Sequence, residues 1–171
     1  MEGPSIRNPL GIMQGRLLPK YNGLYQAHPV DYWQDEFPLV KEMGLDCIEF
    51  ILDYNDFQKN PLMTMSGQQE IQFVSEQTGV SIHSICADYF MEAPLHSDDK
   101  QTAIKSSDTL LELLKASAGL GIKDIVIPCV DNSSIQNERL RDRFKEILLS
   151  IIPDAEQYEV NISLETDLNP F

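Results

Sequence analysis

The feature that most constrains the fold is a series of five short apolar segments, rich in β-branched residues, which recur at intervals of roughly 35–42 residues. Each interval holds a stretch with apolar residues at helical spacing. Regular alternation of strands and helices is typical of a parallel sheet with helices packed against it. The predicted strands are 9–13, 45–51, 80–86, 122–127 and 160–164.

Four helices are expected in these intervals, and polar residues that can accept amide hydrogen bonds mark their starts. Their expected extents are from Asp31 to about residue 43, from Ser66 to about 78, from about 98 to 119, and from Asn132 or Ser133 past 148. Two prolines fall inside these spans. Pro38 predicts a kink or a later start of the first helix, and Pro153 predicts that the last helix ends or resumes there.

Two folds fit a single domain with this alternation. One is an open, doubly wound sheet of five strands, and the other is a (β/α)₈ barrel truncated after strand five. The length of 171 residues favours the open sheet, because a complete barrel has about 250 residues.

Composition excludes some classes of function. The chain has 13 basic and 27 acidic residues, a formal net charge of −14, which disfavours binding to nucleic acid. The first seven residues lack the pattern of a signal peptide, and no apolar run is long enough to span a membrane. Cys47, Cys86 and Cys129 fall in or just after apolar runs and form no metal-binding pair, so we expect buried thiols and a cytoplasmic location.

Several polar side chains follow the predicted strands, where parallel α/β proteins place their chemistry. Glu165 ends the fifth strand and is followed closely by Asp167, which we interpret as a loop residue. The remaining candidates for substrate binding are Gln14, Arg16, Glu49, Asp88 and Asp131. Four of them have a structural alternative: a salt bridge for Arg16, an internal ion pair for Glu49, and loop capping for Asp88 and Asp131.

Other side chains are interpreted as structural. Trp33, Phe37, Tyr89 and Phe90 are expected to pack in the core, with a pocket wall as an alternative for the last two. His83 lies within the third predicted strand and is interpreted as a core histidine. The remaining histidines, His28 and His96, are in loops and have no partner at a metal-ligand spacing.

Four stretches decide between the two folds. They read LGIMQGRLLP at 10–19, WQDEFPLVKEMGLDCIEF at 33–50, GLGIKDIVIPCVD at 119–131 and ISLETD at 162–167. In this order and spacing they resemble the xylose isomerase-like TIM-barrel superfamily, in particular its sugar-phosphate isomerase/epimerase branch. The resemblance covers nearly the whole chain and implies the first five βα units of a TIM barrel.

The resemblance implies a divalent metal (Mn, Mg, Co or Zn) held at the carboxyl end of the strands. Its ligands in the family are a Glu after strand five, an acid after strand six, a His after strand seven and a Glu after strand eight. Only the first maps onto this sequence, at Glu165, which the resemblance also implicates in proton transfer. The other three would lie beyond Phe171.

The leading functional hypothesis is therefore a metal-dependent sugar or sugar-phosphate isomerase or epimerase that works through an enediolate. A second is a non-catalytic polyol-binding or inactive fragment, whose open sheet edges favour a homo-oligomer. A third, an endonuclease IV-like phosphodiesterase, needs histidines after strands two and three. The stretch after the third strand, CADY at 86–89, supplies none.

Overall fold

The computed structural model describes residues 8–167 and contains one parallel sheet of five strands. Residues 1–7, in which the sequence predicts no signal peptide, lie outside that range. The strand order is β1-β2-β3-β4-β5, so each strand pairs with its neighbours in the sequence. The strands are β1 (Gly11–Met13), β2 (Cys47–Ile51), β3 (Ser81–Cys86), β4 (Asp124–Cys129) and β5 (Asn161–Thr166).

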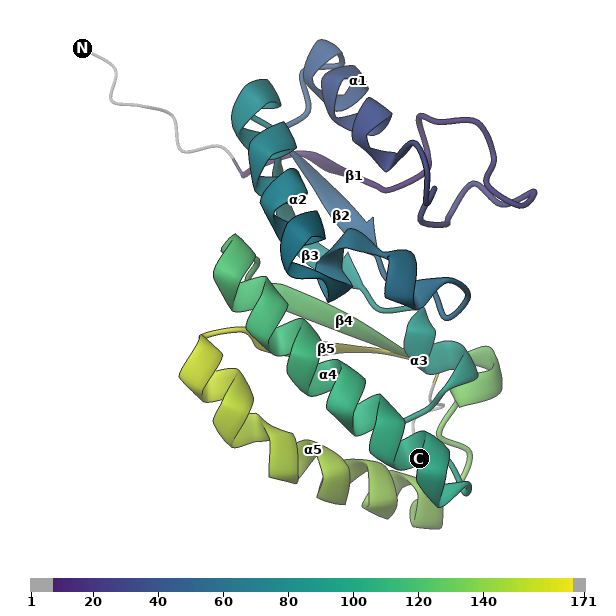
Figure 1. Ribbon diagram of the computed structural model, residues 1–171. Helices are drawn as coiled ribbons and strands as arrows, with labels where there is room; N and C mark the ends of the chain where they lie inside the picture. The colour runs from purple at the N-terminus through teal and green to yellow at the C-terminus, as the bar shows by residue number, and fades with distance from the viewer. Residues whose placement is uncertain (1–7, 168–171) are drawn as a thin grey trace.

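This order decides between the two predicted folds. Crossovers between neighbouring parallel strands are right-handed, so a sheet whose strands follow chain order carries its helices on one face. A doubly wound sheet would instead reverse its order at a switch point and carry helices on both faces. Figure 1 shows the long helices along one side of the sheet. The array of five βα units is the arrangement of a TIM barrel.

The helices begin at other residues than the sequence suggested. They are α1 (Glu36–Glu42), α2 (Met65–Thr78), the short α3 (Tyr89–Glu92), α4 (Lys100–Leu120) and α5 (Glu138–Tyr158). The caps of α2, α4 and α5 are Thr64, Asp99 and Asn137, each accepting a hydrogen bond from a backbone amide of the first turn. The predicted caps Ser66, Asn132 and Ser133 were therefore wrong.

Both prolines are accommodated without ending a helix. The short 3₁₀ helix η1 (Trp33–Asp35) precedes α1, so Pro38 falls in the first turn of α1, where its missing N–H costs little. Asp31 caps neither segment, and the later start allowed by Pro38 is confirmed. Pro153 lies inside α5, which continues past it to Tyr158.

Alternate residues of the strands form the core on the helical side of the sheet. Ile48, Phe50, Ile85 and Ile125 are completely buried there, and the predicted packing residues Trp33, Phe37, Tyr89 and Phe90 belong to the same cluster. Strand β5 departs from the prediction of a buried strand. It pairs with β4 alone among the described strands, and Leu164 is 45% exposed.

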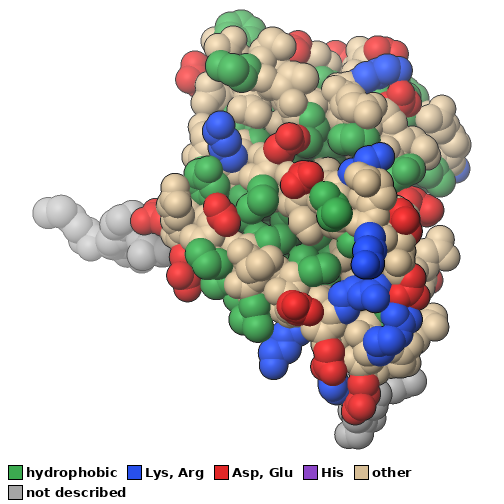
Figure 2. All heavy atoms as spheres, turned by 60° about the horizontal axis from the view of Figure 1, so that its bottom comes forward, with side chains coloured by type: hydrophobic (Ala, Val, Ile, Leu, Met, Phe, Trp, Pro, Cys, Tyr) green, Lys and Arg blue, Asp and Glu red, His purple; other side chains and the backbone are tan. Residues whose placement is uncertain are grey.

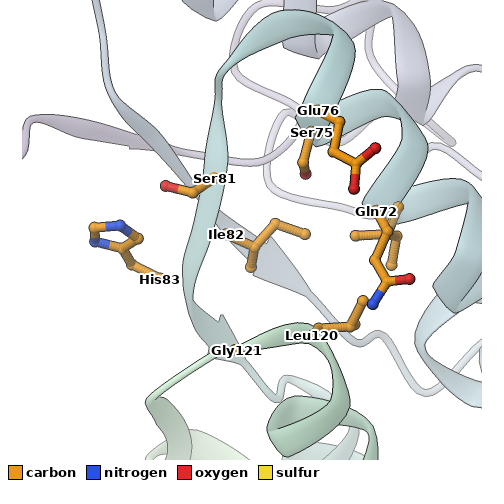
Figure 3. Close-up of a pocket in the computed structure, with 9 residues that line it drawn as sticks. Gln72, Ser75, Glu76, Ser81, Ile82, His83, Leu120 and Gly121 are labelled. Carbon is orange, nitrogen blue, oxygen red and sulfur yellow. The ribbon is translucent and has the colours of Figure 1, made fainter.

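The prediction of a core position for His83 was also wrong. A β-bulge at the pairing of β2 with β3 leaves His83 without a register partner, and its side chain is exposed. Figure 3 shows Ser81 and His83 on the side of β3 opposite Ile82, which faces the core. The three cysteines are free and buried, as expected. Between residues 8 and 167, no helix is long and apolar enough to cross a membrane.

Candidate functional site

The face of the sheet opposite the helices carries hydrogen-bonded polar side chains. Glu49, Ser84 and Asp124 occupy successive register positions on β2, β3 and β4, so their side chains share one face. The Ser84 hydroxyl donates to Glu49 Oε1 at 2.8 Å, and the Ser163 hydroxyl donates to Asp124 Oδ1 at 2.8 Å. Glu49 therefore has a hydroxyl partner within the protein, and not the internal ion pair that was the alternative to substrate binding.

The charges of three of the predicted carboxylates act on the thiol of Cys86, the last residue of β3. The thiol donates a hydrogen bond to Asp88 Oδ1 at 3.1 Å. Burial raises the pKa of the Cys86 thiol well above its usual range, and the charges of Asp88, Glu49 and Glu165 raise it further. Cys86 is thus a neutral thiol, and its pKa responds to carboxylates on β2, just after β3 and on β5.

Two further predicted residues lie on the loop between β1 and α1. Gln14 is completely buried, and its Oε1 accepts the Ile51 amide and contacts His28 Nδ1, each at 3.1 Å. These contacts give Gln14 a structural role at the end of β1. Arg16 is exposed and donates to Gln26 Oε1 at 3.1 Å.

Asp88 and Asp131 follow β3 and β4. Asp88 occupies the position before α3 without capping it, and Oδ2 accepts from Gln26 Nε2 at 3.5 Å. The amide of Gln26 therefore links Arg16 to Asp88. Asp131 is exposed and has a positive φ of 48°, so it sits in a tight turn at the start of η4 (Asp131–Ser133). It is not among the carboxylates whose charges act on Cys86.

Two acids that the sequence did not single out, the buried Glu36 and the half-buried Asp53, anchor the loop after β1. The carboxylate of Glu36 accepts the amides of Gly15 at 2.7 Å and Leu17 at 3.0 Å. Asp53 Oδ2 accepts the amide of His28 at 2.7 Å. The pKa of Asp53 is raised to about 6, mainly by burial; the hydrogen bond from the His28 amide opposes this rise, and the charge of Asp88 adds to it. Asp53 comes two residues after β2, so the rule applied to the other strand ends would have found it.

A cavity of about 280 Å³ opens between this loop and the ends of β2 and β3. Its walls include the acids Asp53, Asp88 and Glu92. They also include Tyr54, whose ring centroid lies 5.4 Å from that of Tyr89. The lining residues are Tyr21, Asn22, Leu24, Gln26, Ala27, Asp53, Tyr54, Asn55, Asp88, Met91 and Glu92. Side chains of this kind can bind a small hydroxylated molecule through hydrogen bonds and an aromatic face.

A second cavity, of about 370 Å³, lies at the opposite end of β3, between α2 and the end of α4 (Figure 3). Gln72 and Glu76 point toward it from α2, whereas His83 points away. The Gln72 amide donates to the Gly119 carbonyl at 3.2 Å. In barrels of this type the amino-terminal ends of the strands serve stability, and the carboxyl ends carry function. We therefore assign the site to the carboxyl ends.

The described residues do not form a metal site by themselves. Glu165 is an exposed carboxylate at the strand end, a ligand type that suits hard divalent cations. Across residues 8–167, however, no group of three or more His, Cys, Asp or Glu side chains could hold a metal ion. Asp167 accepts from the Ser134 hydroxyl at 2.7 Å, which agrees with a loop role.

The histidines give no support to a zinc phosphodiesterase. His28 and His96 are buried and pack against the aromatic rings of Phe50 and Phe144. Burial lowers the pKa of His28 to about 3, so its imidazole is neutral. The third, His83, lies in the bulge of β3.

Taken together, a parallel array with helices on one face and polar side chains at the carboxyl ends of its strands defines the barrel class of α/β proteins. A family model described as xylose isomerase-like TIM barrel matches residues 37–171. The chain belongs to this family.

Known proteins with similar sequences and structures are sugar epimerases and related barrels. The L-ribulose-5-phosphate 3-epimerase UlaE of Salmonella heidelberg (strain SL476) is 26% identical over 148 residues, which are 84% of this chain and 52% of the relative. D-psicose 3-epimerase of Clostridium cellulolyticum H10, solved with D-tagatose, superposes with a TM-score of 0.69 at 18% identity, over 92% of this chain and 52% of that one. The IolI protein, solved with a zinc atom, gives a TM-score of 0.66 at 18% identity over 93% and 51%.

The chain therefore spans about half the length of the relatives that it matches. The structural matches show that the fold is shared, and the sequence match places the chain among relatives that are sugar epimerases.

Proposed function

We propose that this chain forms the amino-terminal side of the active site of a sugar or sugar-phosphate epimerase. The observation that carries the proposal is that Glu49 on β2, Asp88 just after β3 and Glu165 near the end of β5 are borne by one parallel sheet, toward the carboxyl ends of its strands. This is the end of the sheet at which TIM barrels carry their chemistry. Glu165 is the acid–base group in this proposal. It is exposed at the end of β5, where a substrate could reach it.

Epimerisation next to a carbonyl group needs a base that removes a proton from carbon and an acid that returns it to the other face of an enediolate. Glu165 would remove or return the proton, while Asp88 and Glu49 would accept hydrogen bonds from substrate hydroxyls. Asp53 and Glu36 would hold the loop after β1 in place over the same edge. The second acid–base group would come from outside residues 8–167.

We further propose that Glu165 contributes one ligand to a divalent cation. Such a cation, when bound, would stabilise the negative charge of the enediolate oxygens. The remaining ligands would come from outside the described residues, since none of these completes a set with Glu165. The free, buried thiols are compatible with a working location in the cytoplasm.

The test is exchange of a substrate proton with solvent. The chain is first incubated with L-ribulose 5-phosphate or L-ribulose in D₂O that contains Mn²⁺. The cation is then removed from each sample by chelation, and the loss of the C3 proton signal is measured by NMR. Glu165→Gln should slow exchange by about 100-fold or more. The matched control is Glu146→Gln, a change of the same type at an exposed position of α5.

Exchange that is unaffected by Glu165→Gln would refute the role of Glu165. Binding of the sugar without any exchange would favour the second hypothesis, a polyol-binding barrel without turnover. The cavity of about 280 Å³ at the strand ends is the observation that keeps this alternative open.

A further inference from the structure

The cavity beside the loop after β1 has a charge that bears on the substrate. Asp53, Asp88 and Glu92 line it, and no lysine or arginine is among the lining residues. Asp88 is close enough to Asp53 for its charge to raise the pKa of the Asp53 carboxyl. A phosphate group entering this cavity would meet carboxylates without a cation to offset them.

The basic side chains nearest in sequence have other partners. Arg16 donates to Gln26 Oε1, so an amide stands between its guanidinium group and Asp88. Lys20 Nζ lies 4.4 Å from the centroid of the Tyr25 ring. Lys59, on η2 (Phe57–Lys59), pairs with Asp56 at 2.8 Å.

Other basic side chains gather away from the cavity, on the outer helices. Figure 2 shows Lys and Arg side chains clustered toward one side of the face that comes forward in that view. Arg139 and Arg143 on α5 both bind Asp98, which Arg143 contacts at 2.7 Å. Charge is thus distributed so that the cavity stays acidic.

The carboxylates and the aromatic ring in the cavity suit hydroxyl groups and C–H surfaces. Asp53 and Asp88 each accept hydrogen bonds from the protein, at His28 and Gln26. Carboxylate oxygens have further lone pairs for sugar O–H donors. Tyr54 is 45% exposed and lines the cavity, so it offers an aromatic face.

We propose that this cavity is a hydroxyl-recognition subsite that takes an unphosphorylated sugar and discriminates against the phosphate ester, with Asp53 and Asp88 as the specificity-determining residues. The inference rests on the proposed function, because it assumes that the ligand is a sugar. It adds the substrate class, a free ketose, and the residues that select it.

The test compares L-ribulose with L-ribulose 5-phosphate on the full chain, with dissociation constants from ligand-observed NMR titrations in 20 mM and 300 mM NaCl. The free ketose should bind at least about tenfold more tightly at low salt, because like charges repel the ester. Raising the salt should strengthen binding of the ester, because screening weakens that repulsion. A basic phosphate site would respond in the opposite direction.

The variant Asp53→Asn/Asp88→Asn should reduce the preference for the free ketose by about tenfold, because its amides keep hydrogen-bonding groups but lose the charge. The control is Asp108→Asn, at an exposed position of α4 outside this cavity. If the double variant does not fold, the salt dependence of ester binding to the unmodified chain still tests the inference.

Equal or tighter binding of the ester, ester binding that weakens with salt, or binding of neither sugar would overturn the inference. These results are distinct from failure of the proposed function. A free ketose that binds selectively but exchanges no proton would remove the epimerase proposal and keep the subsite. Exchange on the ester alone would do the reverse.

Discussion

Asp53 makes the stability of the protein depend on pH in a direction that can be calculated. Burial raises the pKa of its carboxyl from the ordinary value of 3.8 to about 6. The folded state therefore holds this proton more tightly than the unfolded state. The resulting stability is fully present below pH ~4 and is lost as the pH rises toward ~6.

The magnitude follows from the same values. A pKa raised from 3.8 to about 6 corresponds to about 3 kcal/mol at full strength. Part of the Asp53 side chain remains in contact with solvent, so we reduce this to about 1–2 kcal/mol. Between pH 5 and pH 7.5, where the acidic chain keeps a large net negative charge, we expect a loss of about 1 kcal/mol.

Asp53→Asn removes the titrating group and keeps a side-chain oxygen that can accept the His28 amide. The free energy of unfolding of the variant relative to the unmodified chain should rise by about 1 kcal/mol from pH 5 to pH 7.5. Urea denaturation measures it, with fluorescence from the single tryptophan, Trp33, which is buried against Phe37 and Phe50. Asp108→Asn serves as the control. A difference that is the same at both pH values, or that falls, would show that Asp53 is not held in a desolvated state.

Three further predictions concern stability. Gly67→Ala should cost about 1–3 kcal/mol in urea denaturation, because its Cβ would lie 2.4 Å from the backbone of Pro61; Gly119→Ala, with nothing within 4 Å, should instead stabilise α4 by about 0.5–1 kcal/mol. Asp99→Ala should lower the melting temperature through loss of the α4 cap, worth about 1 kcal/mol, and an unchanged temperature would contradict that role. Glu36→Ala leaves two loop amides unpaired, so limited proteolysis should cut the loop after β1 faster; equal rates would mean that another contact holds it.

The repeating units of the fold could be read from the sequence because their signal is local. Strands β1, β2 and β3 lie within the predicted segments, because runs such as Cys47–Ile51 are apolar and β-branched. Strand β4 begins within the predicted segment 122–127 and continues to Cys129. Helix starts were harder, because several polar residues compete for each cap. Thr64 and Asn137 are the caps because the chain enters α2 and α5 at these residues. The point of entry depends on tertiary structure, which the helix propensity of single residues does not encode.

The site shows the same division. That polar residues follow strand ends could be predicted, and Asp88 and Glu165 lie at the carboxyl ends of β3 and β5. The hydrogen-bond partners of these side chains could not be predicted. Gln14 turns into the protein to meet the Ile51 amide, a choice that depends on which buried backbone group lacks a partner. The bulge that exposes His83 likewise arises from pairing between two strands.

The strand order has a consequence for how the chain acquires its structure. Because every strand pairs only with its neighbours along the chain, each unit can dock as soon as the next one is available, without waiting for a distant segment. Such nearest-neighbour arrays gain stability unit by unit, as solenoid proteins do. During synthesis the sheet can therefore grow in register from β1 onward. Among the described strands, β1 and β5 each have one neighbour, so we expect their amides to exchange with solvent before those of β3.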